Sequence, residues 1–247
     1  MPAHDDPRHN RLLASLTDAD YQSLRPRLQC VELARGQVLH APGLPQHHAW
    51  FPTSAVISKF CTLTSGGSSE VAVVGNEGVV GVSLLLGGDA SVTCSEVLVT
   101  GLAFRIEASA LQAEFGLSAS ARRCLLLYLM ALMAQVAQTA ICNRFHSVEQ
   151  RVCGFLLHTC DRMDGDDVVV TQEMGAAMLG VRREGVTAAV GHLRSAAVVR
   201  LSRGHIDVID LVALEQRACE CHAVVKREYE RLLPPRPVVR SDRDAVR

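Results

Sequence analysis

The chain has 247 residues, of which 48% are hydrophobic, 21% charged and 4% aromatic, so it can bury a large core. This composition excludes a disordered, collagen-like or low-complexity chain and allows one large domain or two small ones. The formal net charge of −1 comes from 25 basic and 26 acidic side chains. It excludes a uniformly basic nucleic-acid coat but permits a local basic patch.

The cysteines and the N-terminus indicate a cytoplasmic protein. Nine cysteines are an odd number scattered through apolar surroundings, which is not typical of a disulfide framework. The polar start, MPAHDDPRHN, lacks the order of a signal peptide. The longest apolar run, residues 124–134, is much shorter than the ~20 residues needed to cross a bilayer, so no membrane segment is expected.

The first half of the chain predicts mainly β structure. Residues 11–29 predict a short helical lid, in which Thr17 and Asp18 can cap a second helix. From Val31 to about Ile106, short runs rich in Val and Leu alternate with Gly, Ser, Asn and Pro, as in an all-β barrel or roll. We therefore predict an α+β chain that begins with a β-roll sensor domain over residues 10–117.

Residues 118–146 predict a long dimerisation helix. The stretch 118–145 contains no Gly or Pro. Coiled-coil steps of 4, 3, 4 and 3 residues predict a dimer interface of Leu125, Leu129, Leu132, Val136 and Thr139. A second apolar stripe beside it consists of Leu126, Met130, Met133 and Ala137. Two stripes suggest that one faces the roll and the other a second copy of the chain; the alternative is an ordinary buried helix.

Residues 147–233 predict a winged helix-turn-helix. A helix from Val148 to about Met163 comes first, and the order strand, helix, turn, helix, hairpin follows. Thr171 can cap the first helix of the motif, and Gly180 stands where a tight turn requires a positive φ. The runs VVRLS and HIDVI flank Arg203 and Gly204, which predicts a hairpin wing.

This segment is locally basic. Residues 180–205 hold five arginines against one glutamate, a net charge of +4, while the whole chain is −1. Arg182, Arg183 and Glu184 open the second helix, where Arg can donate to guanine and Glu can accept from cytosine. Arg200 and Arg203 on the wing suit phosphates. The plainer alternative is a solvated helix start whose charges have no function.

The order of β-roll, long helix and winged helix-turn-helix resembles the Crp/Fnr family of bacterial transcription regulators over residues 10–210. The most specific stretches are TQEMGAAMLGVRREGVT and RFHSVEQRV. The resemblance implies a homodimer that binds a pseudo-palindromic operator in double-stranded DNA, with an effector in the roll and RNA polymerase as a partner. By position, Arg183 and Glu184 match base-reading residues, Thr171 matches a phosphate contact, and Thr187 completes the candidate set.

The chain also departs from the family pattern. Ala188 stands in place of a third base-contacting Arg, Arg182 replaces a small hydroxyl residue, and Gly185 replaces a phosphate-contacting Thr. These differences predict a different half-site sequence.

The cyclic-nucleotide pocket of the family is predicted to be lost, which leaves the effector unknown. Gly81 remains from the family's Gly-Glu pair, but Val82 takes the Glu position, and Ser83 follows in the candidate effector pocket. No Arg occurs from residue 36 to 104, where Lys59 is the only Lys or Arg. A cyclic phosphate would therefore lack its bidentate donor.

No bound metal is predicted. Cys30 is the only cysteine before Cys61, which argues against an iron-sulfur cluster. Cys219, Cys221 and His222 offer soft ligands, but C-x-C-H on one helix cannot aim all three at one ion, and a four-ligand site needs a further residue. Free thiols are therefore expected.

Two rival classes of function remain. A ligand- or redox-sensing interaction module with a degenerate DNA-reading head is the main alternative, because Gly185 and Ala188 weaken the head. A cupin-type metalloenzyme barrel is less favoured, since only the adjacent His47 and His48 are present in place of His-x-His. We therefore expect no enzyme. The end of the chain predicts one charged helix over residues 214–233 and a disordered tail over residues 234–247.

Overall fold

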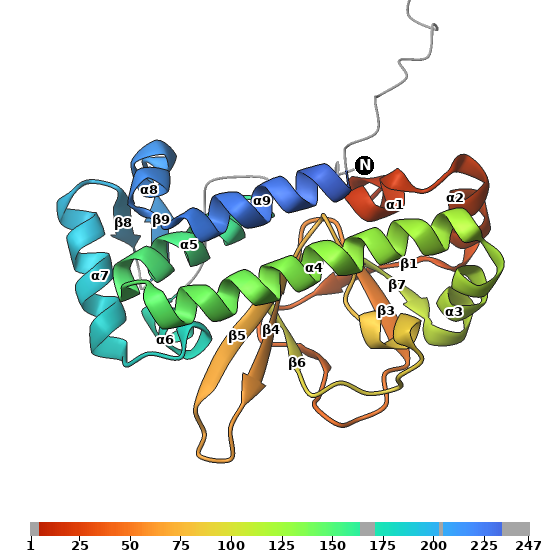
Figure 1. Ribbon diagram of the computed structural model, residues 1–247, viewed down its shortest axis with the longest axis horizontal. Coiled ribbons are helices and arrows are strands. Elements are labelled where there is room, and N and C mark those ends of the chain that lie inside the picture. The colour runs from red at the N-terminus through yellow and green to blue at the C-terminus, as the bar shows by residue number, and fades with distance from the viewer. Residues whose placement is uncertain (1–4, 164–170, 203–204, 234–247) are drawn as a thin grey trace, which may run out of the picture.

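A computed structural model describes residues 5–163, 171–202 and 205–233 of the chain. The chain combines helices and sheets, with a β-rich N-terminal domain, one long helix and a C-terminal helix-turn-helix, as predicted. Figure 1 shows that the long helix α4 (Ala119–Phe145) runs across the whole molecule and joins the β-rich half to the helical half. Residues 234–247, where a disordered tail was predicted, lie outside the described part.

The N-terminal helices close one end of the roll. They are α1 (Arg11–Ser15) and α2 (Asp18–Leu24), flanked by the 3-10 turns η1 (Pro7–His9) and η2 (Arg25–Arg27). The Thr17 hydroxyl caps α2 by accepting a hydrogen bond from the Asp20 backbone at 3.1 Å, which confirms the predicted cap. The buried amide of Asn10 donates to the carbonyls of Pro52 and Gly78, both at 2.8 Å, and so ties these helices to the strands.

The roll consists of two antiparallel sheets. One has the order β1-β7-β3 and the other β2-β6-β4-β5. Apolar side chains from both sheets meet in a buried core that includes Leu33, Trp50 and Val97. The strands are β1 (Gln29–Leu33), β2 (Val38–His40), β3 (His48–Pro52), β4 (Val56–Thr62), β5 (Ser68–Val74), β6 (Cys94–Val99) and β7 (Gly101–Glu107).

Helix α3 (Ala108–Leu117) leads into α4, whose first turn is capped by Ser118. By length and composition α4 could cross a membrane, but it packs against α3, α9 and β5. The predicted seam is corrected here, because Leu125, Leu129 and Leu132 are buried inside the protomer. Leu125 and Leu132 pack there in one apolar core with side chains of the roll and of α9, which cover this side of the helix. The other stripe is the exposed one.

The C-terminal half begins with α5 (Val148–Cys160), which starts at a capping box between Ser147 and Gln150. Helices α6 (Gln172–Leu179) and α7 (Arg183–Ser195) follow, and then the hairpin β8 (Val199–Ser202) and β9 (His205–Val208). The predicted turn at Arg203 and Gly204 lies outside the described residues, as do residues 168–170, where a strand was predicted.

The single charged helix predicted near the C-terminus is two helices. These are α8 (Leu211–Arg217), capped by Asp210, and α9 (Glu220–Leu232). The chain is extended at Ala218 and Cys219 between them. Helix α9 lies along α4 and buries one face, where the Tyr229 hydroxyl and the Gln135 amide are 3.0 Å apart (Figure 1). This apolar face makes α9 part of the core.

Candidate nucleic-acid interface

The turn between α6 and α7 is built from two residues that the sequence identified. Thr171 caps α6, and its hydroxyl accepts a hydrogen bond from the Met174 backbone at 3.1 Å. Gly180 ends the helix with a φ of +62°, the left-handed conformation that glycine adopts without a steric penalty. The two helices of the motif therefore meet at the predicted turn.

Helix α7 has one buried and one charged face. Its buried residues are Val186, Ala189, Val190 and Leu193. Arg182 is the N-cap residue, and Arg183 and Glu184 form the first turn; all three are exposed. The apolar face fixes the helix in the domain, and the charged residues at its N-terminus face solvent.

These three charges are unpaired within the described part of the chain, where none of them forms an ion pair. The positive end of the helix dipole lies at the same place and adds to the attraction for an anion. Thr187 is exposed, but its hydroxyl donates to the Gln172 side chain at 3.0 Å and so links α7 to α6.

The wing is partly neutralised. Arg200 on β8 is exposed, and its Nε lies 3.4 Å from Oδ2 of Asp207 on the paired strand. The Ser202 hydroxyl donates to the same oxygen at 2.6 Å. Sequence reasoning missed Asp207, although its place opposite Arg200 in a hairpin was a usable signal. Arg203 lies outside the described residues.

The motif rests directly on the roll. Helix α6 packs on β5, where the Ser68 hydroxyl donates to the Ala177 carbonyl at 3.1 Å. A Cβ at Gly180 would come within 3.0 Å of the Ser68 carbonyl, so the helix end and the β4–β5 hairpin are in close contact. A guanidinium N–H of Arg151 in α5 donates to the Leu179 carbonyl. A displacement of the β4–β5 hairpin would therefore be transmitted to the helix-turn-helix.

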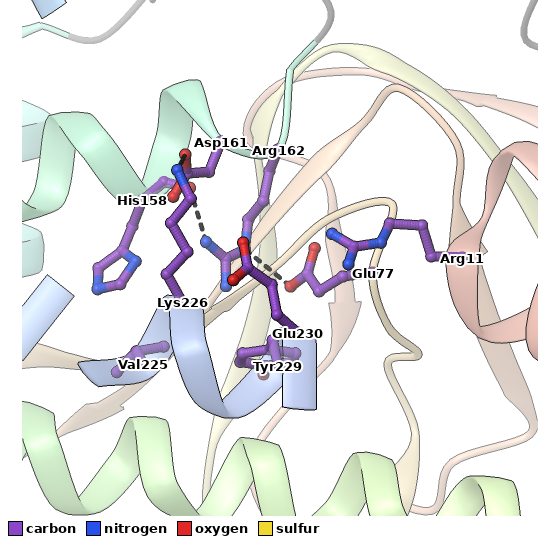
Figure 2. Close-up of a pocket in the computed structure, with 9 residues that line it drawn as sticks. All are labelled: Arg11, Glu77, His158, Asp161, Arg162, Val225, Lys226, Tyr229 and Glu230. Carbon is purple, nitrogen blue, oxygen red and sulfur yellow. Dashed lines mark hydrogen bonds and ion pairs between the residues drawn. The ribbon is translucent and has the colours of Figure 1, made fainter. Parts of the chain in front are cut away.

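A buried ion pair joins the two halves of the chain. Figure 2 shows the Arg162 guanidinium, just after α5, pointing toward the Glu77 carboxylate of the roll. The Nε–Oε1 distance is 2.7 Å, and the side chains are only 5% and 6% exposed. Burial lowers the pKa of Arg162, but the adjacent carboxylate outweighs this and raises the pKa overall. The pair lines a pocket between α5, α9 and the roll.

The candidate effector residues lie at the start of the 3-10 helix η3 (Val82–Leu86). Gly81 has a φ of +111° and closely approaches Ala49, while the Ser83 hydroxyl donates to Gln46 at 2.5 Å. Lys59 is buried in the same roll, 3.5 Å from the Ser95 hydroxyl, and burial lowers its pKa. This lysine forms no ion pair with a described residue.

One side of α4 presents unusually large apolar side chains to solvent. Leu126, Met130 and Met133 are 45%, 53% and 71% exposed, and Ile141 and Phe145 continue the stripe. Val136 from the predicted dimer interface is 41% exposed and Thr139 is half-buried. The free apolar face of the helix is therefore centred on the second stripe noted in the sequence.

Comparison with known proteins agrees with this architecture. Residues 150–217 match the family model of the Crp-like helix-turn-helix domain. Solved structures similar to the chain include the following three. A protein described as a Crp/Fnr-family transcriptional regulator from Eubacterium rectale has a TM-score of 0.66 at 18% identity, covering 85% of this chain and 98% of its own. FixK2 from Bradyrhizobium japonicum has a TM-score of 0.67 at 14% sequence identity, and the match covers 78% of this chain and 98% of FixK2. A CRP-family transcriptional regulator from Thermus thermophilus, TTHB099, has a TM-score of 0.64 at 19% sequence identity, and the match covers 76% of this chain and 96% of TTHB099. No curated protein matches the chain.

The fold and the motif together define the class. The chain has the architecture of these solved Crp/Fnr-type regulators, with a β-roll joined by a long helix to a helix-turn-helix. Within it, residues 150–217 form a Crp-like helix-turn-helix domain.

Proposed function

We propose that this chain is a transcription regulator that binds double-stranded DNA sequence-specifically, as a homodimer on a pseudo-palindromic operator. The observation that carries this proposal is the exposed, unpaired set Arg182, Arg183 and Glu184 at the N-terminus of a helix whose opposite face is buried. A recognition helix presents this end to the major groove.

The side chains have distinct roles in the proposed complex. Arg183 donates two hydrogen bonds to a guanine and Glu184 accepts from cytosine N4, each worth roughly 1 to 3 kcal/mol of discrimination. Arg182 extends the contact beside them. Thr171, Thr187 and Arg200 would contact the sugar-phosphate backbone and so position the helix without reading sequence.

Dimerisation would place two recognition helices at a fixed spacing that matches the DNA. The exposed stripe of Leu126, Met130 and Met133 runs along α4, and a second copy of the same helix would cover it in a two-fold arrangement. Two recognition helices related in this way meet successive major grooves about 34 Å apart.

The roll is the proposed sensor of a cytoplasmic regulator, with RNA polymerase as a further partner. An effector at Gly81, Val82 and Ser83 would act by favouring one arrangement of the halves over another. The hairpin contact with α6 and the Arg162–Glu77 pair provide the physical connection. Cyclic AMP is not the proposed effector, because no arginine occurs from residue 36 to 104 of the roll; calorimetric binding at micromolar affinity would contradict this.

The test is selection from random duplexes with the purified full chain, followed by titration of the enriched site at increasing salt. Arg183→Ala should abolish preference for that site but retain binding to random DNA. Arg194→Ala is the matched control, because Arg194 has the same charge and is exposed at the other end of α7. Equal loss on all sequences would contradict the role of Arg183. Absence of affinity for any duplex would favour the interaction-module alternative.

A further inference from the structure

Four metal-ligating side chains converge where α4 ends and α9 begins. Cys142 and His146 are four residues apart, in the last turn of α4 and at its C-cap, so they lie on the same side of the helix. Cys219 is the N-cap residue of α9 and Cys221 follows in its first turn. The two pairs come from segments 77 residues apart in the sequence.

The spacing of the ligand atoms suits one tetrahedral ion. The sulfurs of Cys142 and Cys219 are 3.6 Å apart, and the Cys221 sulfur is 3.6 Å from Nδ1 of His146. All four ligand atoms lie within 4.8 Å of one another. Tetrahedral Zn²⁺, with bonds of about 2.3 Å to sulfur and 2.0 Å to nitrogen, requires separations of about 3.8 Å and 3.5 Å.

The surroundings also resemble a zinc site. Cys219 and Cys221 are buried, and Cys142 and His146 are half-buried. The other ring nitrogen of His146, Nε2, lies 3.5 Å from a carboxylate oxygen of Glu220, an arrangement that orients a ligating imidazole.

We propose that Cys142, His146, Cys219 and Cys221 bind one Zn²⁺ ion as a structural Cys₃His site. No described function of the fold requires this ion, and the proposal does not depend on DNA binding. Binding would release thiol protons and leave no open coordination position, so the ion would not be catalytic.

The sequence argued against a metal site here, because three ligands on one helix cannot all reach one ion and a fourth ligand was missing. The structure resolves both points. Cys219 precedes α9 and is not constrained by helical geometry, and α4 supplies the two missing ligands. His222 takes no part, since its Nε2 lies 2.7 Å from the Asp161 carboxylate instead. The relevant sequence signal was Cys142-x₃-His146, a spacing that sequence reasoning did not connect with the later cysteines.

The consequence of the site is mechanical. His146 immediately precedes Ser147, which caps α5, so the ion would join the end of α4 to the α8–α9 junction across the start of the C-terminal half. It would hold the angle between the long helix and the helix-turn-helix.

The first experiment measures metal content and cobalt spectra of the full chain, purified under reducing conditions from zinc-supplemented cells. We expect about one zinc ion per chain, and cobalt substitution should give thiolate charge-transfer bands and the d–d bands of a tetrahedral site. Cys219→Ser should weaken zinc binding by about 100-fold or more. Cys94→Ser, which alters a buried cysteine in the roll, should leave zinc binding unchanged.

Two further measurements separate ligation from misfolding. His146→Cys should restore the zinc affinity that His146→Ala loses, since Cys₄ is also a zinc ligand set. In the unaltered chain, zinc should protect Cys142, Cys219 and Cys221 from alkylation, and a chelator should expose them. Zinc-free protein, bound iron instead of zinc, a Cys142–Cys219 disulfide under these conditions, or equal zinc in Cys219→Ser would each overturn the proposal.

Discussion

Removing Glu77 should destabilise the chain strongly, because it leaves the Arg162 guanidinium buried without a counter-charge. The two side chains are 5% and 6% exposed and 2.7 Å apart, and the Glu77 carboxylate also accepts from the Gly75 backbone at 3.1 Å. Breaking a buried pair of this kind costs about 3–5 kcal/mol. Glu77→Ala should therefore lower the free energy of unfolding by that amount.

The measurement is urea unfolding followed by circular dichroism, at one fixed protomer concentration because a dimer's stability depends on it. Glu228→Ala is the control, since it breaks a solvent-exposed pair with Arg231 that is screened by water and should cost far less. A second variant, Glu77→Ala with Arg162→Met, should recover much of the loss, because no unpaired cation remains. A cost for Glu77→Ala equal to that of the control would refute the reasoning.

Three other changes test the interface, the turn and the pH dependence. Met133→Glu should give monomers in sedimentation, whereas Val92→Glu, at an exposed position in the roll, should not; a dimeric Met133→Glu would remove this face from the interface. Gly180→Ala should cost at least about 1–2 kcal/mol in thermal unfolding, because of its positive φ. Gly191→Ala within α7, where an added Cβ meets nothing, should instead stabilise by about 0.5–1 kcal/mol, and the same sign for both would contradict the assigned geometry. Burial raises the pKa of Glu70 from 4.5 to about 7, so its contribution to stability is present below pH 4.5 and lost as the pH rises through 7. Glu70→Gln should thus gain stability relative to the unaltered chain between pH 5 and pH 8, and a constant difference across that range would exclude the shift.

Local features of the helix-turn-helix were predictable from the sequence. The Thr171 cap and the Gly180 turn depend on residues only a few positions apart, so composition and spacing are sufficient to find them. The order of the domains was predictable from the residue composition of successive segments. Short strands separated by Gly come first, then a long helix without Gly or Pro, and then a basic segment.

Contacts between distant segments were not predictable. Glu77 and Arg162 are 85 residues apart, and nothing local marks either as a partner of the other. Helical periodicity found both apolar stripes of α4, but it does not tell which of them the roll and α9 cover. The choice of Leu125, Leu129 and Leu132 was wrong for that reason. The cluster of cysteines and His146 was missed on the same ground.

The ion pair on the wing reduces the electrostatic contribution that Arg200 would make to DNA binding. The Nε of Arg200 already lies 3.4 Å from Asp207, so a phosphate bound by the other guanidinium N–H groups would share the arginine with that carboxylate. The carboxylate would therefore offset part of the attraction between Arg200 and the phosphate. In the proposed complex, fewer counterions would leave the duplex than the number of wing cations suggests, and the salt dependence contributed by Arg200 would be less than that of one free charge.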